Sequence, residues 1–228
     1  MDLSGLNREK VKARWRRIHE SEMRYLTMHE NQTAHLKARI HAYLCGDGSV
    51  SWRRERANGK LHCEIRFYPD DKSMLRSFSD AFRAVYGREP HVKKLKNHYR
   101  VAITSMTAAK DLLGDGKFSS TEWAIPDWIL QNEQNSLEWL RAFFDAEAYV
   151  GRKRICVQCV NRNGLTQVEE MLKRIGIESR RYEYTRKNPN WNINYHLVIT
   201  GLGNKVAFLK RVGFNHKKKL NKLKADVA

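Results

Sequence analysis

The chain has 228 residues, with 43 Lys and Arg against 25 Asp and Glu, a net charge of +18 and a pI near 9.9. This length suffices for one large domain or two small ones with a real core. The charge predicts a polyanionic partner. No apolar run approaches the roughly 20 residues that span a bilayer. The N-terminus lacks a basic segment followed by an apolar one, so we expect an intracellular protein, cytoplasmic or organellar, that is neither secreted nor bound to a membrane.

Residues 1–33 form a basic extension that includes the run from Lys10 to Arg17. We expect this extension to be helical. Two roles remain open for it: a solvated amphipathic cover over the body of the protein, or an accessory helix that contacts nucleic-acid phosphates.

Two similar segments follow about 100 residues apart, at 34–46 and 136–146, and each is predicted to be a helix that leads to an acidic residue. Asp47 follows the first helix and Glu147 follows the second. In the same register, each helix has an apolar face and two small residues four positions apart: Ala42 and Gly46, Ala142 and Ala146. Because small side chains let helix backbones approach, we expect the two helices to pack side by side.

The elements after each helix repeat in the same order. The Asn58-Gly59 pair predicts a hairpin, and Pro126 marks a connector between the halves. In the first half we expect strands at 50–54, 61–67, 91–96 and 98–104, with helices at 72–86 and 106–113. In the second half we expect strands at 152–161, 179–186 and 192–200, with helices at 165–175 and from 204 onward. This order predicts an α+β fold with a duplicated α-β-β-α-β-β-α unit and pseudo-twofold symmetry, the repeats covering residues 34–131 and 132–228.

Asp47 and Glu147 are unusual at the end of an apolar helix face, because burying an unpaired charge is costly. Either residue alone would be read as a helix end that merely turns the chain, as Gly46 and Gly48 suggest. Their matched registers, in a chain of charge +18, favour a shared function. Two facing carboxylates repel each other unless a divalent cation lies between them, and Mg²⁺ binds a few carboxylates together with water and phosphate oxygens. Paired metals about 4 Å apart serve phosphodiester hydrolysis.

The segments Ile40–Gly48 and Leu140–Ala148 resemble the two motifs of the single-chain LAGLIDADG homing endonucleases, of the archaeal or organellar intron-encoded type. The resemblance extends through Ile125-Pro126 and the stretch Val212–Leu220, and so covers roughly residues 35–228. Ala148 replaces the final motif glycine in the second half. The family's acidic residue at the eighth motif position binds metal, which implies this role for Asp47 and Glu147, assisted by the backbone carbonyls of Gly46 and Ala146.

The resemblance also implies two four-stranded antiparallel sheets that form a DNA-binding saddle, with the motif helices packed at its centre. The implied activity is Mg²⁺-dependent cleavage of double-stranded DNA across the minor groove at a long asymmetric site, leaving short 3′ overhangs, by a monomer. Mn²⁺ or Ca²⁺ would substitute for Mg²⁺ in binding. Arg162, next to Asn161, fits the basic catalytic residue of the second half, whereas the first half offers no clear counterpart. The alternative is a non-cleaving protein on the same scaffold, an intron RNA maturase or a transcription regulator.

Alternating strands would read DNA with one face, since Arg, Gln, Asn and His can bond to base edges; an ordinary solvated sheet face is the alternative. The predicted contacts in the first half are Arg53, Arg54, Arg56, His62, Glu64, Arg66, Tyr68, Lys94, Lys96 and Arg100. Those in the second half are Arg152, Arg154, Gln158, Asn161, Arg180, Arg181, Asn192, Asn194 and His196. The lysines of the last helix, from Lys217 to Lys224, either touch phosphate or are solvated.

Two patterns suggest zinc only weakly. Cys156 and Cys159 are spaced as a Cys-x-x-Cys pair, but an alternating strand would point them to opposite faces. His91 and His98 are expected on neighbouring strands without a nearby acidic partner, and so fit surface or DNA-facing positions better than a metal pair.

Overall fold

The computed structural model describes residues 3–54, 61–185, 188 and 191–228. The first half contains α1 (Leu3–Asp47), β1 (Gly48–Arg54), β2 (Leu61–Phe67), α2 (Lys72–Tyr86), β3 (His91–Lys94), β4 (Tyr99–Ile103) and α3 (Met106–Asp115). The short helix α4 (Asp127–Leu130) leads to the second half, which contains α5 (Glu133–Glu147), β5 (Ala148–Gly151), β6 (Arg154–Cys159), α6 (Arg162–Arg174), β7 (Arg180–Tyr184), β8 (Asn194–Thr200), α7 (Leu202–Arg211) and α8 (Lys217–Val227).

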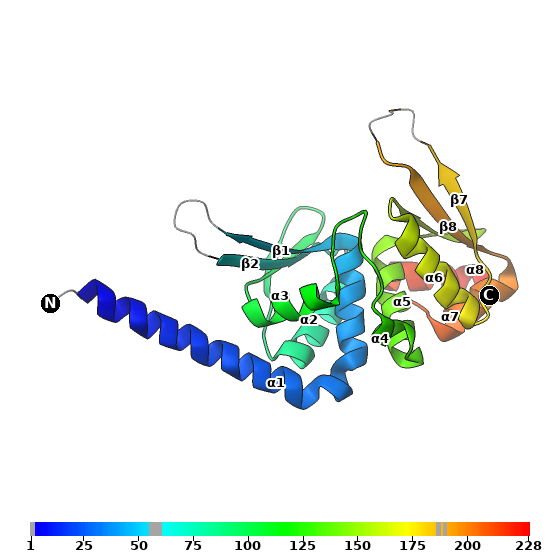
Figure 1. Cartoon of the computed structure of the whole chain (residues 1–228). Coiled ribbons are helices and arrows are strands. Elements are labelled where there is room, and N and C mark those ends of the chain that lie inside the picture. The colour runs from blue at the N-terminus through cyan, green and yellow to red at the C-terminus, as the bar shows by residue number, and fades with distance from the viewer. Residues whose placement is uncertain (1–2, 55–60, 186–187, 189–190) are drawn as a thin grey trace.

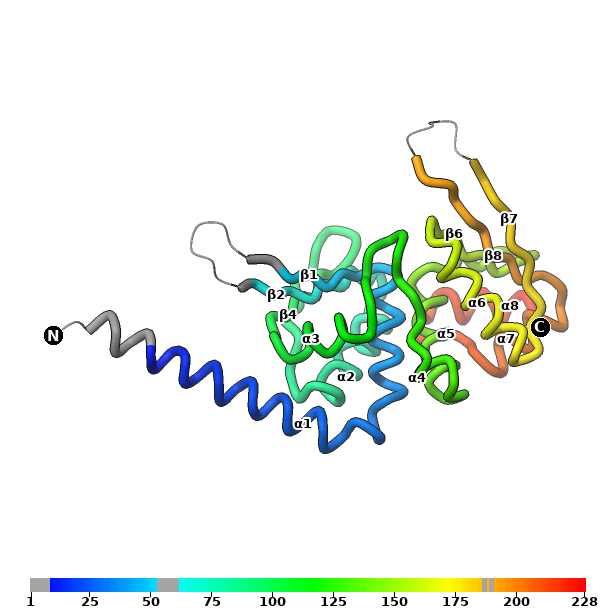
Figure 2. The backbone as a smooth tube through the Cα atoms, viewed as in Figure 1, coloured from blue at the N-terminus to red at the C-terminus, as the bar shows by residue number. Residues whose placement is uncertain are grey.

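The two halves have the same sheet topology, and the predicted α+β class is confirmed. Each sheet has four strands, in the orders β1-β2-β4-β3 and β5-β6-β8-β7, and every neighbouring pair is antiparallel. In Figure 1 the C-terminal part of α1 and α5 occupy the middle of the molecule, and the strand pairs β1-β2 and β7-β8 extend outward on either side of them. The backbone trace of Figure 2 shows the same arrangement.

The N-terminal extension and the first motif helix form one element, whereas the sequence predicted a motif helix that begins near residue 34. Helix α1 runs without interruption for 45 residues. No proline occurs in it, and no glycine occurs between Gly5 and Gly46, so nothing in this stretch breaks the helix. Figure 1 shows that α1 bends, so that its N-terminal part points away from the body.

The second half contains a strand that the sequence did not separate from its neighbour. A single strand was expected at 152–161, but β5 and β6 form a hairpin in which Tyr149 pairs with Cys156. Strand β5 has only four residues and begins directly after Glu147, with no glycine or proline to mark the change from helix to strand. The lysine-rich end of the chain is likewise a helix of its own, α8, and not part of α7.

The predicted apolar faces of the motif helices form the centre of the core. Six side chains on these faces have no exposed surface: Ile40, Tyr43, Leu44, Leu140, Phe143 and Phe144. The small residues let the helices touch at their C-terminal ends, since a Cβ atom added to Gly46 would lie 2.8 Å from the Cβ of Ala146. A contact of that length is shorter than packed carbon atoms allow. The close approach of α1 and α5 therefore requires glycine at position 46.

Gly46→Ala should destabilise the fold by about 1–3 kcal/mol, because the added methyl group forces the two helices apart. Gly114→Ala is the matched control, since nothing lies within 4 Å of a Cβ at this exposed position in α3. Alanine in a helix is favoured over glycine by up to about 1 kcal/mol, so the control should be at least as stable as the parent. Thermal melts of the parent and both variants measure these differences in stability. Equal stability of Gly46→Ala and the parent would contradict the close packing.

Candidate functional site

The two motif acids lie together where α1 and α5 end. Asp47 is the last residue of α1, and Glu147 is the last residue of α5. The carboxylate of Glu147 reaches across the helix pair, because its Oε1 lies 3.2 Å from the position of a Cβ on Gly46. Asp47 is exposed and Glu147 is half-buried. The pseudo-twofold arrangement thus brings together two carboxylates from distant parts of the chain.

The surroundings of this helix end disfavour ionisation of the two carboxyl groups. Burial raises the pKa of Glu147 to about 7, and the negative charge of Asp47 adds to the rise. The pKa of Asp47 is also raised, because surrounding protein desolvates its carboxylate even though the residue as a whole is exposed. The Lys219 ammonium opposes both shifts, and Asp70 adds to that of Asp47.

Lys219 on α8 reaches the same helix end. Its Nζ donates hydrogen bonds to three carbonyl oxygens at the end of α5: those of Phe144 (3.5 Å), Asp145 (2.5 Å) and Ala146 (3.1 Å). Burial lowers the pKa of Lys219, whereas the four nearby acids Asp70, Asp145, Asp47 and Glu147 act to raise it. A lysine at a helix C-terminus interacts favourably with the exposed carbonyls and the helix dipole.

This contact involves a carbonyl that the family resemblance assigned to the metal. The Ala146 carbonyl, expected to assist metal binding together with that of Gly46, accepts a hydrogen bond from Lys219, and its oxygen keeps a second lone pair. The sequence placed Lys219 only among lysines that touch phosphate or solvent. A contact between residues more than 70 positions apart leaves no trace in local spacing, and the resemblance of Val212–Leu220 to the family was the one available signal.

Asp70 and His216 form a second pair beside Asp47. His216 Nε2 lies 3.4 Å from Asp70 Oδ1, and the hydrogen bond from His216 is the largest cause of the lowered pKa of Asp70. Asp70 follows β2 and His216 precedes α8, so this pair joins the first half of the chain to its last helix. The sequence offered neither residue for the site.

The acids fit a divalent ion that takes few protein ligands. Within residues 3–54, 61–185, 188 and 191–228, no group of three or more His, Cys, Asp and Glu side chains is arranged to hold a metal. Asp47 and Glu147 supply two carboxylates at an open helix end, and the charge of one raises the pKa of the other. Mg²⁺ suits such a donor set, because it keeps several waters and accepts phosphate oxygens.

The first sheet carries a polar outer face, opposite the buried Cys63, Ile65 and Phe67. His62, Glu64 and Arg66 lie on this outer face, as predicted from their alternation. Directly paired residues share a face, so the ladder also places Arg100, Lys93 and His91 there. His91 was expected at a surface or DNA-facing position, and the pairing agrees with a place on this face. Lys93 was not among the predicted contacts, whereas the predicted Lys94 pairs with Tyr99 on the opposite face.

The other five predicted contacts of the first half are Tyr68, Lys96, Arg53, Arg54 and Arg56. Tyr68 follows β2, and its backbone N–H donates to the Asp47 carbonyl over 3.0 Å. Lys96 is exposed in the turn after β3. Arg53 and Arg54 lie in β1, and Arg56 lies outside the described residues.

The second sheet has a less basic outer face. Arg154, Gln158 and Arg180 are exposed there, and Arg152 is exposed in the β5–β6 turn. Cys156 was expected to face outward as well, but only 2% of it is exposed, because Tyr149 and Val198 flank it in the ladder. Gln158 pairs with His196, and Asn194 Nδ2 contacts both, at 3.5 Å and 3.3 Å. Tyr182 and Tyr184, which the sequence did not single out, are exposed on the same face.

Some predicted contacts of the second half are not on this face. Asn161 is buried and caps α6: its Oδ1 accepts from Gly164 N–H, and its Nδ2 donates to the Trp123 carbonyl over 2.6 Å. Arg181 points to the helix side of the sheet, where it bonds to Thr166 and lies 3.7 Å from Glu169. Asn192 is exposed just before β8 begins. The sequence treated Asn161 and Arg181 as readers because polarity alone does not reveal a cap or an ion pair.

Arg162 occupies the first turn of α6, exposed, 3.9 Å from Glu183. It is not among the residues that line a cavity of about 330 Å³ beside Glu147. Asp71 caps α2 as Asn161 caps α6, so Lys72 is the residue of the first half that corresponds to Arg162. Aligning the two halves by their N-caps thus gives a correspondence that the spacing of the two repeats in the sequence does not reveal.

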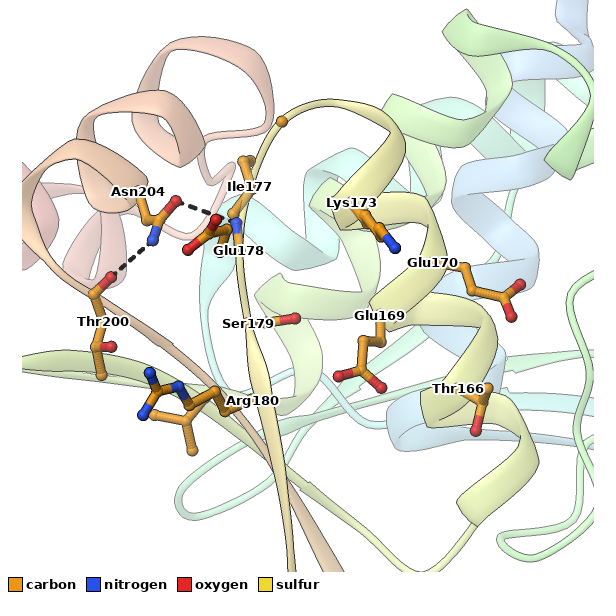
Figure 3. A pocket seen from close by; sticks show the side chains of 12 residues that line it. Thr166, Glu169, Glu170, Lys173, Ile177, Glu178, Ser179, Arg180, Thr200 and Asn204 are labelled. Atoms are coloured by element: carbon orange, nitrogen blue, oxygen red, sulfur yellow. Dashed lines mark hydrogen bonds between the residues drawn. The ribbon is translucent and has the colours of Figure 1, made fainter.

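A cavity of about 330 Å³ opens beside the acids, lined by Glu147, Gly46, Gln158, Cys159 and Asn194 among others. Cys159 therefore faces this cavity, whereas Cys156 lies on the opposite face of β6, as predicted. A larger cavity of about 650 Å³ lies between α6 and β7 (Figure 3). Neither motif acid lines it, so it is separate from the candidate site.

Glu147→Gln should stabilise the folded protein at high pH. The folded pKa of about 7 lies above the ordinary 4.5, so the fold favours the protonated form and loses stability as pH rises from 4.5 through 7. The uncharged variant avoids this loss. In metal-free buffer its Tm should exceed that of the parent at pH 8, and the gain should vanish near pH 4.5. Glu122→Gln is the control, because the exposed Glu122 has a lowered pKa and its loss gives no gain at pH 8. An equal gain at both pH values would contradict the assignment.

Comparison with known proteins supports the fold. Residues 134–213 match the model of a LAGLIDADG-like domain. The glutamine–fructose-6-phosphate aminotransferase (isomerizing) of Methanocaldococcus jannaschii is 25% identical over 193 residues, which cover 82% of this chain and 17% of that protein. The chain spans less than a fifth of the length of the curated relatives it matches.

Two solved structures are similar over most of the chain. The homing endonuclease I-DmoI in complex with DNA and Mn has a TM-score of 0.65 at 12% identity, covering 79% of this chain and 97% of that one. The full-length DUF199/WhiA protein from Thermatoga maritima has a TM-score of 0.56 at 11% identity, covering 86% of this chain and 61% of that one. These findings confirm the resemblance carried by the two motifs. Residues 134–213 are a LAGLIDADG-like domain, and most of the chain has the LAGLIDADG fold.

Proposed function

We propose that this protein is a divalent-metal-dependent endonuclease that cleaves double-stranded DNA at a long asymmetric site and leaves short 3′ overhangs. The observation that carries the proposal is the meeting of Asp47 and Glu147 at the ends of two packed helices, between two sheets of a chain with charge +18. A purely structural role does not explain why a fold would bring two carboxylates together and raise the pKa of both.

In this proposal residues 34–131 and 132–228 each bind one half-site as parts of a monomer. The outer faces of the two sheets hold the major grooves, and the acids meet the minor groove between them. Basic side chains on the first sheet, such as Arg66 and Arg100, bind phosphates and base edges. The sheets thus hold the scissile phosphates against the helix ends, where positioning itself contributes to the rate.

Asp47 and Glu147 would hold Mg²⁺, for which Mn²⁺ or Ca²⁺ could substitute in binding. The ion would supply Lewis-acid stabilisation of the phosphate charge and a nucleophilic hydroxide at neutral pH. The protein's own residues complete the site: the carboxylates orient the ion, and the Lys219 ammonium offsets negative charge beside both of them. Arg162, and Lys72 in the first half, are the proposed basic residues near the flanking phosphates.

Two similar structures bear on the choice between cleavage and binding alone. I-DmoI is a homing endonuclease whose complexes contain DNA with Mn or Ca, and the DUF199/WhiA protein has a similar fold. The matched pair of acids favours cleavage here. A non-cleaving maturase or regulator remains the alternative outcome of the experiment below.

Asp47→Asn with Glu147→Gln should abolish cleavage and preserve DNA binding. An amide cannot replace a carboxylate as a Mg²⁺ ligand, so the single variants should lose orders of magnitude in rate and the double variant should be inactive. The substrate is DNA selected by binding from a randomised library in Ca²⁺ and then incubated with Mg²⁺. The double variant should bind this DNA at least as tightly as the parent in metal-free buffer, since like-charge repulsion toward phosphate is removed. Cleavage of both strands by the double variant would refute the site; selected DNA that the parent binds but never cuts would favour the alternative.

The selected half-sites should differ in sequence. The first outer face presents His62, Glu64 and Arg66, whereas the second presents Arg154, Gln158 and the exposed Tyr182. Different donors and acceptors read different base edges. Sequencing of the selected pool tests this expectation, and recovery of a perfect palindrome would show that these strands do not read the site.

A further inference from the structure

Asp145, two residues before Glu147, is a buried acid that metal binding does not use. None of its surface is exposed, and three donors surround its carboxylate. The Tyr43 hydroxyl donates to Oδ2 over 3.0 Å, the backbone N–H of Asn215 donates to Oδ2 over 3.2 Å, and that of His216 donates to Oδ1 over 2.9 Å. The two backbone donors belong to the segment at the start of α8, for which His216 is the N-cap.

A second set of hydrogen bonds joins the same two helix ends, and here the charged group lies on α8. Lys219, in the first turn of α8, donates to the carbonyl oxygens of Asp145 and Ala146 at the end of α5. A carboxylate at a helix N-terminus and an ammonium at a helix C-terminus are both favoured by the helix dipoles. The ends of the two helices therefore hold each other: α5 supplies the anion for α8, and α8 supplies the cation for α5.

We propose that Asp145 is a positioning residue, which fixes the start of α8 so that the Lys219 ammonium is held at the end of the second motif helix. Its importance for cleavage rests on the function proposed above. Asp145 contacts neither the DNA nor the metal in this proposal; it acts only through α8.

Among the described residues of the first half, no equivalent of this arrangement is found. Cys45 occupies the position two residues before Asp47, and its Sγ lies 3.4 Å from His41 Nδ1. Burial raises the pKa of the Cys45 thiol, so it provides no anion for a helix N-terminus. The last helix of the first half, α3, is followed by the connector and not by a counterpart of α8. The positioned cation is thus a feature of the second half.

The first test measures how fast an amine-acylating reagent modifies Lys219. The folded protein is labelled briefly, and peptide mass spectrometry then measures the modification of each lysine. Lys217 and Lys218 are exposed neighbours in the same helix and serve as internal references, whereas Lys219 is half-buried and bonded. Asp145→Asn should raise the rate at Lys219 severalfold and leave both references unchanged. Tyr43→Phe removes the hydroxyl that donates to Asp145 and that also bonds to Ser77 and Asn215. It leaves the Asp145 carboxylate and both backbone donors in place, so it is the milder variant and should raise the rate at Lys219 by a smaller factor.

The matched control is Asp226→Asn. Asp226 anchors the other end of α8 through its ion pair with Lys205, at 2.5 Å. This substitution also weakens the attachment of α8, but at the end remote from Lys219, so labelling of Lys219 should stay close to that of the parent. Unchanged Lys219 labelling in both Asp145→Asn and Tyr43→Phe overturns the proposal, as does an equal rise in Asp226→Asn.

The second test measures single-turnover cleavage at saturating DNA, together with the Kd for DNA. Asp145→Asn should cut about tenfold to a hundredfold more slowly, as expected for a misplaced group, with Kd unchanged. In a Lys219→Met background the same substitution should cost nothing further, because the group that it positions is gone. Normal cleavage by Asp145→Asn, or full additivity with Lys219→Met, overturns the positioning role. A parent that binds but does not cut refutes the proposed nuclease alone, and the labelling test still decides the role of Asp145.

Discussion

The contact between Gly46 and Ala146 is the constraint on which the rest of the molecule depends. Two helices that end in acidic residues approach so closely there that the first tolerates no side chain at its contact point. The approach fixes the distance between the two sheets, since each sheet begins directly after its motif helix, at Gly48 and Ala148. One packing contact therefore sets both the spacing of the acids and the spacing of the surfaces beside them.

The same contact creates an electrostatic problem that the fold only partly solves. Burial at the helix ends raises the pKa of Asp47 and Glu147, the charge of Asp47 adds to the rise at Glu147, and the Lys219 ammonium compensates incompletely. A fully neutralised pair would have no reason to bind a cation. In the proposed function, the residual excess of negative charge makes this helix end a suitable place for a divalent ion, at the expense of stability when the ion is absent.

Periodicity and the internal repeat sufficed to predict the duplicated topology, the buried helix faces and the pairing of the two acids. These features depend on local spacing, which a sequence displays directly. The sequence did not predict that the N-terminal extension and the first motif helix form one helix. A continuous helix is signalled only by the lack of Pro and Gly, which is a weaker signal than an N-cap residue. Lys219, Asp70 and Asp145 were missed for another reason: their contacts join residues about 70 or more positions apart, or meet at the start of a helix whose docking no pattern reveals. Asn161 and Arg181 were misplaced because a polar side chain on a strand end can bond to the protein instead of to a partner.

Helix α1 joins the N-terminal extension to Asp47 without any loop. An α-helix turns by about 100° per residue. If another protein were fused to the N-terminal end of α1 through a continuous helix, its orientation about the helix axis would depend on the number of joining residues. Inserting one residue would swing the fused protein around the axis, and inserting seven would nearly restore its direction. The length of the junction would therefore set the direction in which an added DNA-binding module points relative to the two acids.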